Sequence, residues 1–203
     1  GRLLPTGNAL DQLEVAGLGR IAATLVDAAN PAVFVAAAGL GKTGVELPDA
    51  LEKDTAFLAH MEAIRRAGSL AMGLAPDLEA AGRQRSIPLV AMVAAPAEAP
   101  TLSGRQLAAD EVDIHVRMIS MGQPHKATPI TGAVCLAVAA QVPGGLPQAV
   151  RRPGAGPLRI GHPSGTTLVD AKVAGAGAGL KAEHGAVYRT ARRLFEGNVL
   201  YRG

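Results

Sequence analysis

The chain has 203 residues, a formal net charge of +3 at pH 7 and 48% hydrophobic residues, mostly Ala, Val and Leu. This apolar fraction excludes a disordered chain, so the 25 Gly and 14 Pro indicate many turns between short strands. Aromatic residues make up only 2% and the basic residues are mostly scattered, which argues against nucleic-acid binding. The slight excess of basic residues is equally compatible with binding of an anionic small molecule.

Cysteine use and hydropathy indicate the compartment. The only cysteine, Cys135, leaves no disulfide within the chain, which fits a reducing environment. Residues 1–8 lack the charged and apolar segments of a signal peptide. No apolar run reaches the roughly 18–20 residues that span a bilayer. We therefore expect a cytoplasmic protein without a membrane segment.

The first half of the chain predicts strands around one clear helix. β-branched and apolar residues favour strands at 20–29 and 32–36, separated at Asn30 because a residue before proline avoids helical geometry. A glycine-rich loop follows. Asp54 is a good N-cap for an amphipathic helix over 54–70. Its apolar face carries Phe57, Met61, Ile64 and Gly68, with Glu62, Arg65 and Arg66 mainly on the other face.

A buried strand at 87–94 and a loop at 95–105 come next. Residues 113–120 alternate between apolar and polar, which predicts a half-buried strand. Residues 131–142 are apolar almost all round, and a helix without a polar face is normally enclosed by other elements. We therefore expect a central helix wrapped by a curved sheet and stopped at 143–145.

The last quarter reads as turns and short strands. Residues 144–156 predict a mobile loop, and 162–165 and 174–179 predict turns. Strands are expected at 158–160, 166–173, 186–193 and 198–201. The whole chain therefore predicts an α+β fold whose strands are mostly joined by turns.

One candidate site lies at the start of the apolar helix. The positive end of a helix dipole and its free N–H groups favour carboxylates or phosphates. Thr131 is a plausible N-cap, and Gly132 would let a ligand approach the backbone at Gly132 and Ala133. His125 and Lys126 would add cationic donors. The alternative is an ordinary helix start after a polar loop.

Two turns are further candidates. Ser164 and Gly165 follow His162-Pro163 in a tight turn that would present N–H groups and a hydroxyl to an anion. Asn30, at the end of a strand, would either fix its turn or hydrogen-bond a carboxylate. In both places an ordinary turn is the alternative.

Other chemical signals are weak. Cys135 lies one turn into the apolar helix, where it is either a small buried hydrophobe or a thiolate activated by the helix start. The His and Cys residues show no metal-ligand spacing. The run GLGKT at 39–43 lacks the spacing of a phosphate-binding loop.

Six segments taken together resemble the PrpF family, which includes 2-methylaconitate cis-trans isomerases and 4-oxalomesaconate tautomerases. They read GRLLPTGN, LVDAANPAVFV, GLGKTGVELP, RMISMGQPHKATPITGAVCLAVAA, GHPSG and RTARRLFEG, and lie at 1–8, 25–35, 39–48, 117–140, 161–165 and 189–197. The resemblance runs from the first residue nearly to the last. No single motif decides it, but six in the right order are specific.

The resemblance implies a fold similar to diaminopimelate epimerase, in which two lobes each wrap a curved sheet round a central helix. Residues 1–203 would be the C-terminal lobe. The N-terminal lobe, absent from this chain, would carry the family's catalytic Lys and Cys, so no catalytic residue is assigned here. The implied reaction is cofactor-independent proton transfer beside a carboxylate of an unsaturated di- or tricarboxylate.

Under this resemblance the chain would supply carboxylate-binding donors to a small-molecule polycarboxylate and would be inactive alone. The donors would be Thr131, Gly132, Ala133, Ser164 and Gly165, with His125, Lys126 and Asn30 as weaker candidates. Two alternatives stay open: a non-catalytic polycarboxylate-binding module, and an amino-acid epimerase of the same fold. The isolated lobe would expose an apolar interface, through which it would pair with the missing lobe or self-associate.

Overall fold

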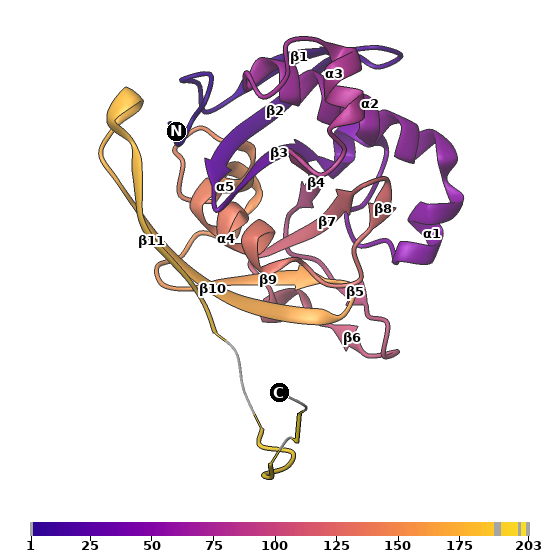
Figure 1. Ribbon diagram of the computed structural model, residues 1–203, viewed down its shortest axis with the longest axis vertical. Helices are drawn as coiled ribbons and strands as arrows, with labels where there is room; N and C mark the ends of the chain where they lie inside the picture. The colour runs from indigo at the N-terminus through magenta and orange to yellow at the C-terminus, as the bar shows by residue number, and fades with distance from the viewer. Residues whose placement is uncertain (1, 189–191, 199, 202–203) are drawn as a thin grey trace.

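The computed structural model describes residues 2–188, 192–198 and 200–201. Within those residues nine strands form one sheet, in the order β1-β2-β3-β4-β7-β9-β10-β11, with β8 paired to β7 (Figure 1). The strands are β1 Asp11–Val15, β2 Gly19–Ala28, β3 Asn30–Ala36, β4 Leu89–Ala94, β7 Ile114–Ser120, β8 Gln123–Pro124, β9 Leu158–His162, β10 Gly165–Ala174 and β11 Lys181–Val187. A small separate pair joins β5 Ala99–Pro100 to β6 Gln106–Leu107.

The helices divide between the two faces of this sheet. The α-helices are α1 Pro48–Lys53, α2 Thr55–Ala71, α3 Leu78–Arg83, α4 Ile130–Ala139 and α5 Leu146–Val150. Short 3-10 turns lie at η1 Ala37–Leu40, η2 Ala109–Glu111 and η3 Gly177–Gly179. One apolar core surrounds α4, and a second one lies under α2 on the other side of the sheet (Figure 1).

The sheet is mixed, mostly antiparallel, and curved. Only the β3–β4 and β7–β9 pairs are parallel among the strands that the structure describes. Helix α4 contacts β2 and β3 in one half of the sheet and β10 and β11 in the other half. One helix can touch both halves only if the sheet bends round it, so the prediction of a curved sheet enclosing an apolar helix is confirmed (Figure 1).

Helix α4 is built for close packing. It begins at Ile130 and ends at Ala139, so the predicted range of 131–142 is late at its start and too long at its end. Its interior residues, from Cys135 to Ala139, are almost wholly buried. A side chain at Gly132 would overlap Met118 of β7 and press on Leu89 of β4. The small residues of α4 therefore set its distance from the sheet.

Helix α2 confirms the amphipathic prediction, with one exception. The Asp54 carboxylate accepts a hydrogen bond of 2.9 Å from the N–H of Phe57, as an N-cap should. Phe57, Met61 and Ile64 are buried against the sheet. Arg65, however, is only 2% exposed, although the pattern places it mainly on the polar face. The reason is that α3 and the segment leading to β4 cover that part of α2.

The first strands lie where they are predicted, but β7 corrects an expectation. It is buried on both faces, not half-buried. Met118 packs toward α4, while Arg117 on the opposite face donates to the Glu46 carbonyl at 2.5 Å. His115 is also covered, and its Nε2 lies 2.8 Å from the Ala97 carbonyl. The loops before α1 and after β4 therefore cover the face that the alternation assigned to solvent.

Several other expectations are wrong in their details. The predicted loop at 144–156 contains α5, which is held by a hydrogen bond of 2.9 Å from the Leu146 N–H to the Thr24 hydroxyl. The elements β1, α1 and α3 are not predicted at all. The strand expected at 186–193 is β11, which begins earlier and ends at Val187. Residues 189–191 and 199 lie outside the described residues, and Asn198, Leu200 and Tyr201 belong to no strand.

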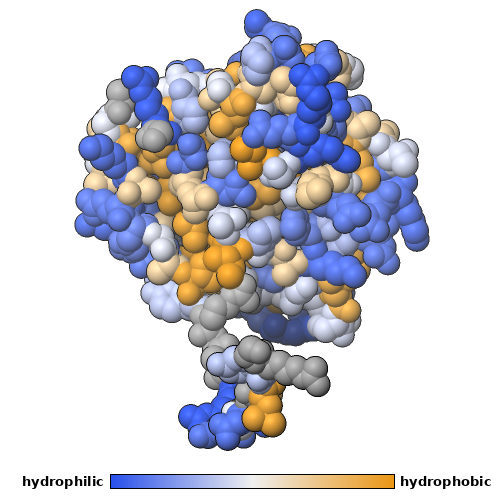
Figure 2. All heavy atoms as spheres, viewed as in Figure 1, coloured by the Kyte–Doolittle hydropathy of each residue, from blue (hydrophilic) through white to orange (hydrophobic). Residues whose placement is uncertain are grey.

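The described part of the C-terminal segment leaves the body of the molecule (Figure 1). Its large apolar side chains are almost fully exposed, and Figure 2 shows hydrophobic atoms on this segment below the body. They are Leu194, Phe195, Leu200 and Tyr201. Exposed apolar side chains in such number are typical of a surface that contacts another protein unit.

Candidate functional site at one edge of the sheet

The structure brings together two of the three predicted constellations, the start of α4 and the Ser164 turn. Strands β7 and β9 are parallel but staggered: Gly161 pairs with His115, so β9 ends beside the first half of β7. The Ser164 turn therefore reaches the segment before α4 at Lys126, which has folded back along β7. Helix α4 begins near the end of β7, because Gly132 packs on Met118 and Leu89. Asn30 begins β3 beyond the end of β7, away from the Ser164 turn.

The Ser164 turn is tied directly to the segment before α4. The Ser164 hydroxyl donates to the Lys126 carbonyl at 2.7 Å, and its N–H donates to His162 Nδ1 at 3.2 Å. Ser164 is exposed, and Gly165 has a φ of 126°, which a residue with a side chain rarely adopts. Ser164 therefore lies at the rim of the site, and its hydroxyl proton is donated to the Lys126 carbonyl.

The start of α4 differs from the prediction. The N-cap is Pro129, not Thr131, and within the described residues no side chain caps this helix start. The Ala133 N–H donates to the Pro129 carbonyl at 2.8 Å, which engages one of the three predicted donors. The N–H groups of Thr131 and Gly132 belong to the first turn, whose donors have no carbonyl partner inside a helix. Gly132 is also required for packing, a role that its sequence context does not reveal.

His125 and Lys126 line the path into α4. The His125 N–H donates to the Met118 carbonyl at 2.8 Å, which extends the β7–β8 hairpin. Burial lowers the pKa of the His125 imidazole below its ordinary 6.5, so at pH 7 it is neutral and not the cationic donor that the sequence suggested. Lys126 is exposed, and its ammonium group carries the positive charge in this segment.

Cys135 is a buried hydrophobe. Its side chain is 0% exposed, and its thiol lies 3.6 Å from the Val26 carbonyl. Burial raises the pKa of the Cys135 thiol to about 12, so the helix start does not make it a thiolate.

A groove of about 610 Å³ runs along the side of α4, next to the β2–β3 turn. Val134 and Val138 of α4 line one side of it, and its polar lining includes Asp27, Lys181 and His184. This groove was not predicted from the sequence, because its walls come from three segments far apart in the chain: the N-terminal segment, the β2–β3 turn and β11.

Two arginines that were not singled out from the sequence lie near the site: Arg117, which is buried, and Arg85, which is hydrogen-bonded to a turn. Arg117 lies on the face of β7 away from α4, and burial lowers its pKa to about 10. Arg85 precedes β4 and reaches the Met121 carbonyl at the edge that carries the candidate site. Arg85 belongs to a polar run just before β4. That run is the sequence feature that could have indicated a functional role for Arg85.

Metal ligands and membrane helices are not found where the structure can be described. Residues 2–188, 192–198 and 200–201 contain no cluster of three or more His, Cys, Asp or Glu side chains that could hold a metal ion. Over the same residues, no helix is both long enough and apolar enough to cross a membrane.

The fold and this edge define a class of α+β proteins in which a curved mixed sheet encloses a central helix. The family model described as PrpF protein matches residues 1–202, and the chain belongs to that family. A solved structure titled methylitaconate-delta-isomerase superposes with a TM-score of 0.82 at 30% identity, covering 92% of this chain and 51% of that one.

Related sequences carry isomerase and tautomerase names. The chain is 40% identical to 2-methyl-aconitate isomerase of Shewanella oneidensis, over 98% of this chain and 50% of that protein. It is 36% identical to 3-methylitaconate isomerase of Eubacterium barkeri, over 98% and 52%. It is 30% identical to 4-oxalomesaconate tautomerase of Pseudomonas putida, over 98% and 49%. The chain thus spans about half the length of these relatives.

Proposed function

We propose that this chain is one lobe of a cofactor-independent isomerase or tautomerase that moves a proton or double bond on an unsaturated di- or tricarboxylate such as methylaconitate. The observation that carries the proposal is the contact of the Ser164 turn with Lys126, in the segment that leads into the start of α4. The isomerase and tautomerase names of the relatives support the reaction class.

The chemistry follows from charge. A polycarboxylate needs positive or N–H donors, and removal of a proton next to a carboxylate builds further negative charge on oxygen. The free N–H groups of Thr131 and Gly132 at the positive end of α4 would hold one carboxylate. The Gly165 N–H and Lys126 would hold another, while the Ser164 hydroxyl, which donates to the Lys126 carbonyl, would position Lys126. Asn30 would be a more distant donor at the start of β3.

The acid and base would come from the rest of the protein. At this edge, the groups that could transfer protons are few: His125 is half-buried and neutral at pH 7, and Cys135 is fully buried in α4. We therefore place the acid/base pair in a second lobe that would face this edge, as in the diaminopimelate epimerase-like arrangement. The exposed apolar residues of the C-terminal segment fit contact with such a lobe.

The test is proton NMR in deuterium oxide on the full-length gene product that contains residues 1–203. We expect interconversion of 2-methylaconitate isomers with deuterium incorporated beside a carboxylate, and none with the 203-residue chain alone. Turnover by the 203-residue chain would contradict the division of the site between lobes. Lack of turnover by the full-length protein with methylaconitate, methylitaconate and oxalomesaconate would contradict the reaction class.

Calorimetry with trans-aconitate separates this function from a simple binding module. Micromolar binding together with no chemistry in the full-length protein would favour the module. An amino-acid epimerase of the same fold is the weaker alternative, because it needs a reactive cysteine at the helix start and Cys135 is buried with a raised pKa.

A further inference from the structure

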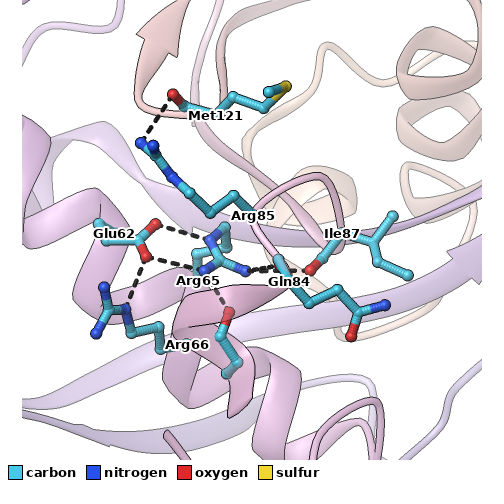
Figure 3. Close-up of polar contacts among 8 residues, drawn as sticks. Glu62, Arg65, Arg66, Gln84, Arg85, Ile87 and Met121 are labelled. Carbon is cyan, nitrogen blue, oxygen red and sulfur yellow. Dashed lines mark hydrogen bonds and ion pairs between the residues drawn. The ribbon is translucent and has the colours of Figure 1, made fainter. Parts of the chain in front are cut away.

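We infer that Arg85 is a positioning residue for the candidate site: it fixes the β7–β8 turn, and the buried Arg65 fixes Arg85. The inference rests on the proposed function only for its effect on catalysis. Figure 3 shows the contacts that connect α2, the segment before β4 and this turn.

The buried Arg65 holds the segment that carries Arg85. Arg65 is 2% exposed and pairs with the Glu62 carboxylate through two hydrogen bonds of 2.7 and 2.8 Å. Its remaining donors bind three backbone carbonyls, of Ala81 at 2.7 Å, Gln84 at 2.9 Å and Ile87 at 3.1 Å (Figure 3). A guanidinium has five N–H donors in a rigid plane, so this arrangement locks the backbone on both sides of Arg85 to helix α2.

Arg85 contacts the β7–β8 turn directly. The exposed Arg85 donates from Nη2 to the Met121 carbonyl at 3.0 Å. Ser120 pairs with Gln123, so Met121 and Gly122 form a two-residue hairpin turn. Met121 has a φ of 53° and Gly122 a φ of 82°. This geometry suits glycine, and a methionine keeps it only where neighbouring groups hold it. Arg85 is such a group.

The β7–β8 turn leads directly into the candidate site. Directly after the turn come β8, then His125, whose N–H is bonded to Met118, and Lys126, whose carbonyl accepts the Ser164 hydroxyl. A shift of the turn would therefore be passed on to Lys126 and to the segment that leads into α4. A side chain at Gly122 would come within 3.0 Å of Arg85 Nη2, so the turn and the arginine fit each other closely.

Arg83 provides a matched control. It lies two residues from Arg85, is also exposed, and pairs with Glu79 within α3 at 2.5 Å. Arg83→Gln therefore removes the same charge from the same segment without touching the turn. Arg85→Lys is the conservative variant, because an ammonium group on a long stem can still donate to a carbonyl.

Hydrogen exchange on the full-length gene product tests the positioning directly. We expect Arg85→Gln to speed exchange of the amides of residues 121–123, 125 and 126 several-fold, while Arg83→Gln leaves them unchanged and Arg85→Lys restores most of the protection. Unchanged exchange in Arg85→Gln would overturn the inference, whether or not the protein proves to be an isomerase.

Kinetics give the second measurement. Since a misplacement near 1 Å can cost up to about 100-fold in rate, we expect Arg85→Gln to lower kcat by about 10-fold with KM changed much less. Arg83→Gln should match the parent, and thermal stability should be equal in the two variants. Parental kcat in Arg85→Gln would overturn the catalytic part of the inference. Absence of turnover in the parent would contradict the proposed function, and the exchange measurement would still decide on Arg85.

Discussion

The Ser164 hydroxyl donates a hydrogen bond of 2.7 Å to the carbonyl of Lys126, 38 residues earlier in the chain. This single contact joins the β9–β10 turn to the segment that leads into α4. It also fixes the relative position of the two groups of donors that the proposed site requires.

Ser164→Ala removes this contact, which positions Lys126 at the rim of the site. Because the residue is exposed, we expect the free energy of unfolding to fall by only about 0.5–1.5 kcal/mol. A misplacement near 1 Å can cost up to about 100-fold in rate, so we expect displacement of Lys126 to lower kcat/KM of the full-length protein at least about 10-fold. Urea unfolding and steady-state kinetics check the two values. Ser103→Ala, which removes another exposed hydroxyl, should have parental kinetics, and equal effects of both variants would contradict a role for Ser164.

Gly132→Ala tests the close approach of α4 to the sheet. The added methyl group would overlap the Met118 sulfur and come within 3.3 Å of Leu89 Cδ1. Overpacking a core costs about 1–3 kcal/mol, which exceeds the gain of up to about 1 kcal/mol from replacing glycine in a helix. We expect lower stability in urea unfolding. Gly154→Ala is the control, because among the described residues nothing lies within 4 Å of a side chain there.

Cys135→Ala should leave catalysis largely intact. The thiol is fully buried and its pKa is raised to about 12, so at pH 8 it is neither accessible nor ionised. A thiol-specific reagent should react only after unfolding. Loss of the buried sulfur should cost on the order of 1 kcal/mol. Complete loss of activity in a folded Cys135→Ala protein would contradict this expectation and favour the alternative of an amino-acid epimerase with a catalytic cysteine.

Glu62 predicts how stability changes with pH. Burial raises the pKa of its carboxyl, but hydrogen bonds from Arg65 and Arg66 outweigh burial, and the net pKa lies below the ordinary 4.5. A carboxyl with a lowered pKa in the folded state contributes stability above its unfolded pKa and loses that contribution as pH falls through the folded value. Stability should therefore drop as pH is lowered below about 4.5.

Glu62→Gln should remove part of that pH dependence. The variant should be less stable at pH 7, because Arg65 stays buried without a charged partner. Its free energy of unfolding should also vary less between pH 4.5 and the acid unfolding transition. Urea unfolding at a series of pH values checks both expectations. Parental pH dependence in Glu62→Gln would show that other carboxylates control acid stability, and Glu79→Gln, on an exposed pair, is the control.

The two helices show how far local patterns reach. Asp54 and the spacing of Phe57, Met61 and Ile64 predict α2, because a cap and an apolar stripe are local properties. The lack of a polar face predicts that α4 is enclosed. The same reasoning fails for Arg65, because its burial depends on α3 and on the segment before β4, which fold over it from positions far along the chain.

The family, the enclosed apolar helix and the residue types that could bind an anion could all be predicted from local residue patterns. For each candidate segment, however, an ordinary turn or helix start explained the sequence as simply as an anion-binding site did. The meeting of the Ser164 turn with the segment before α4 depends on the tertiary structure, because β9 must pair with the start of β7 and β8 must fold back along β7. Pairing between distant strands is set by long-range packing, which is why no local pattern revealed the contact of Ser164 with Lys126 or of Arg85 with Met121.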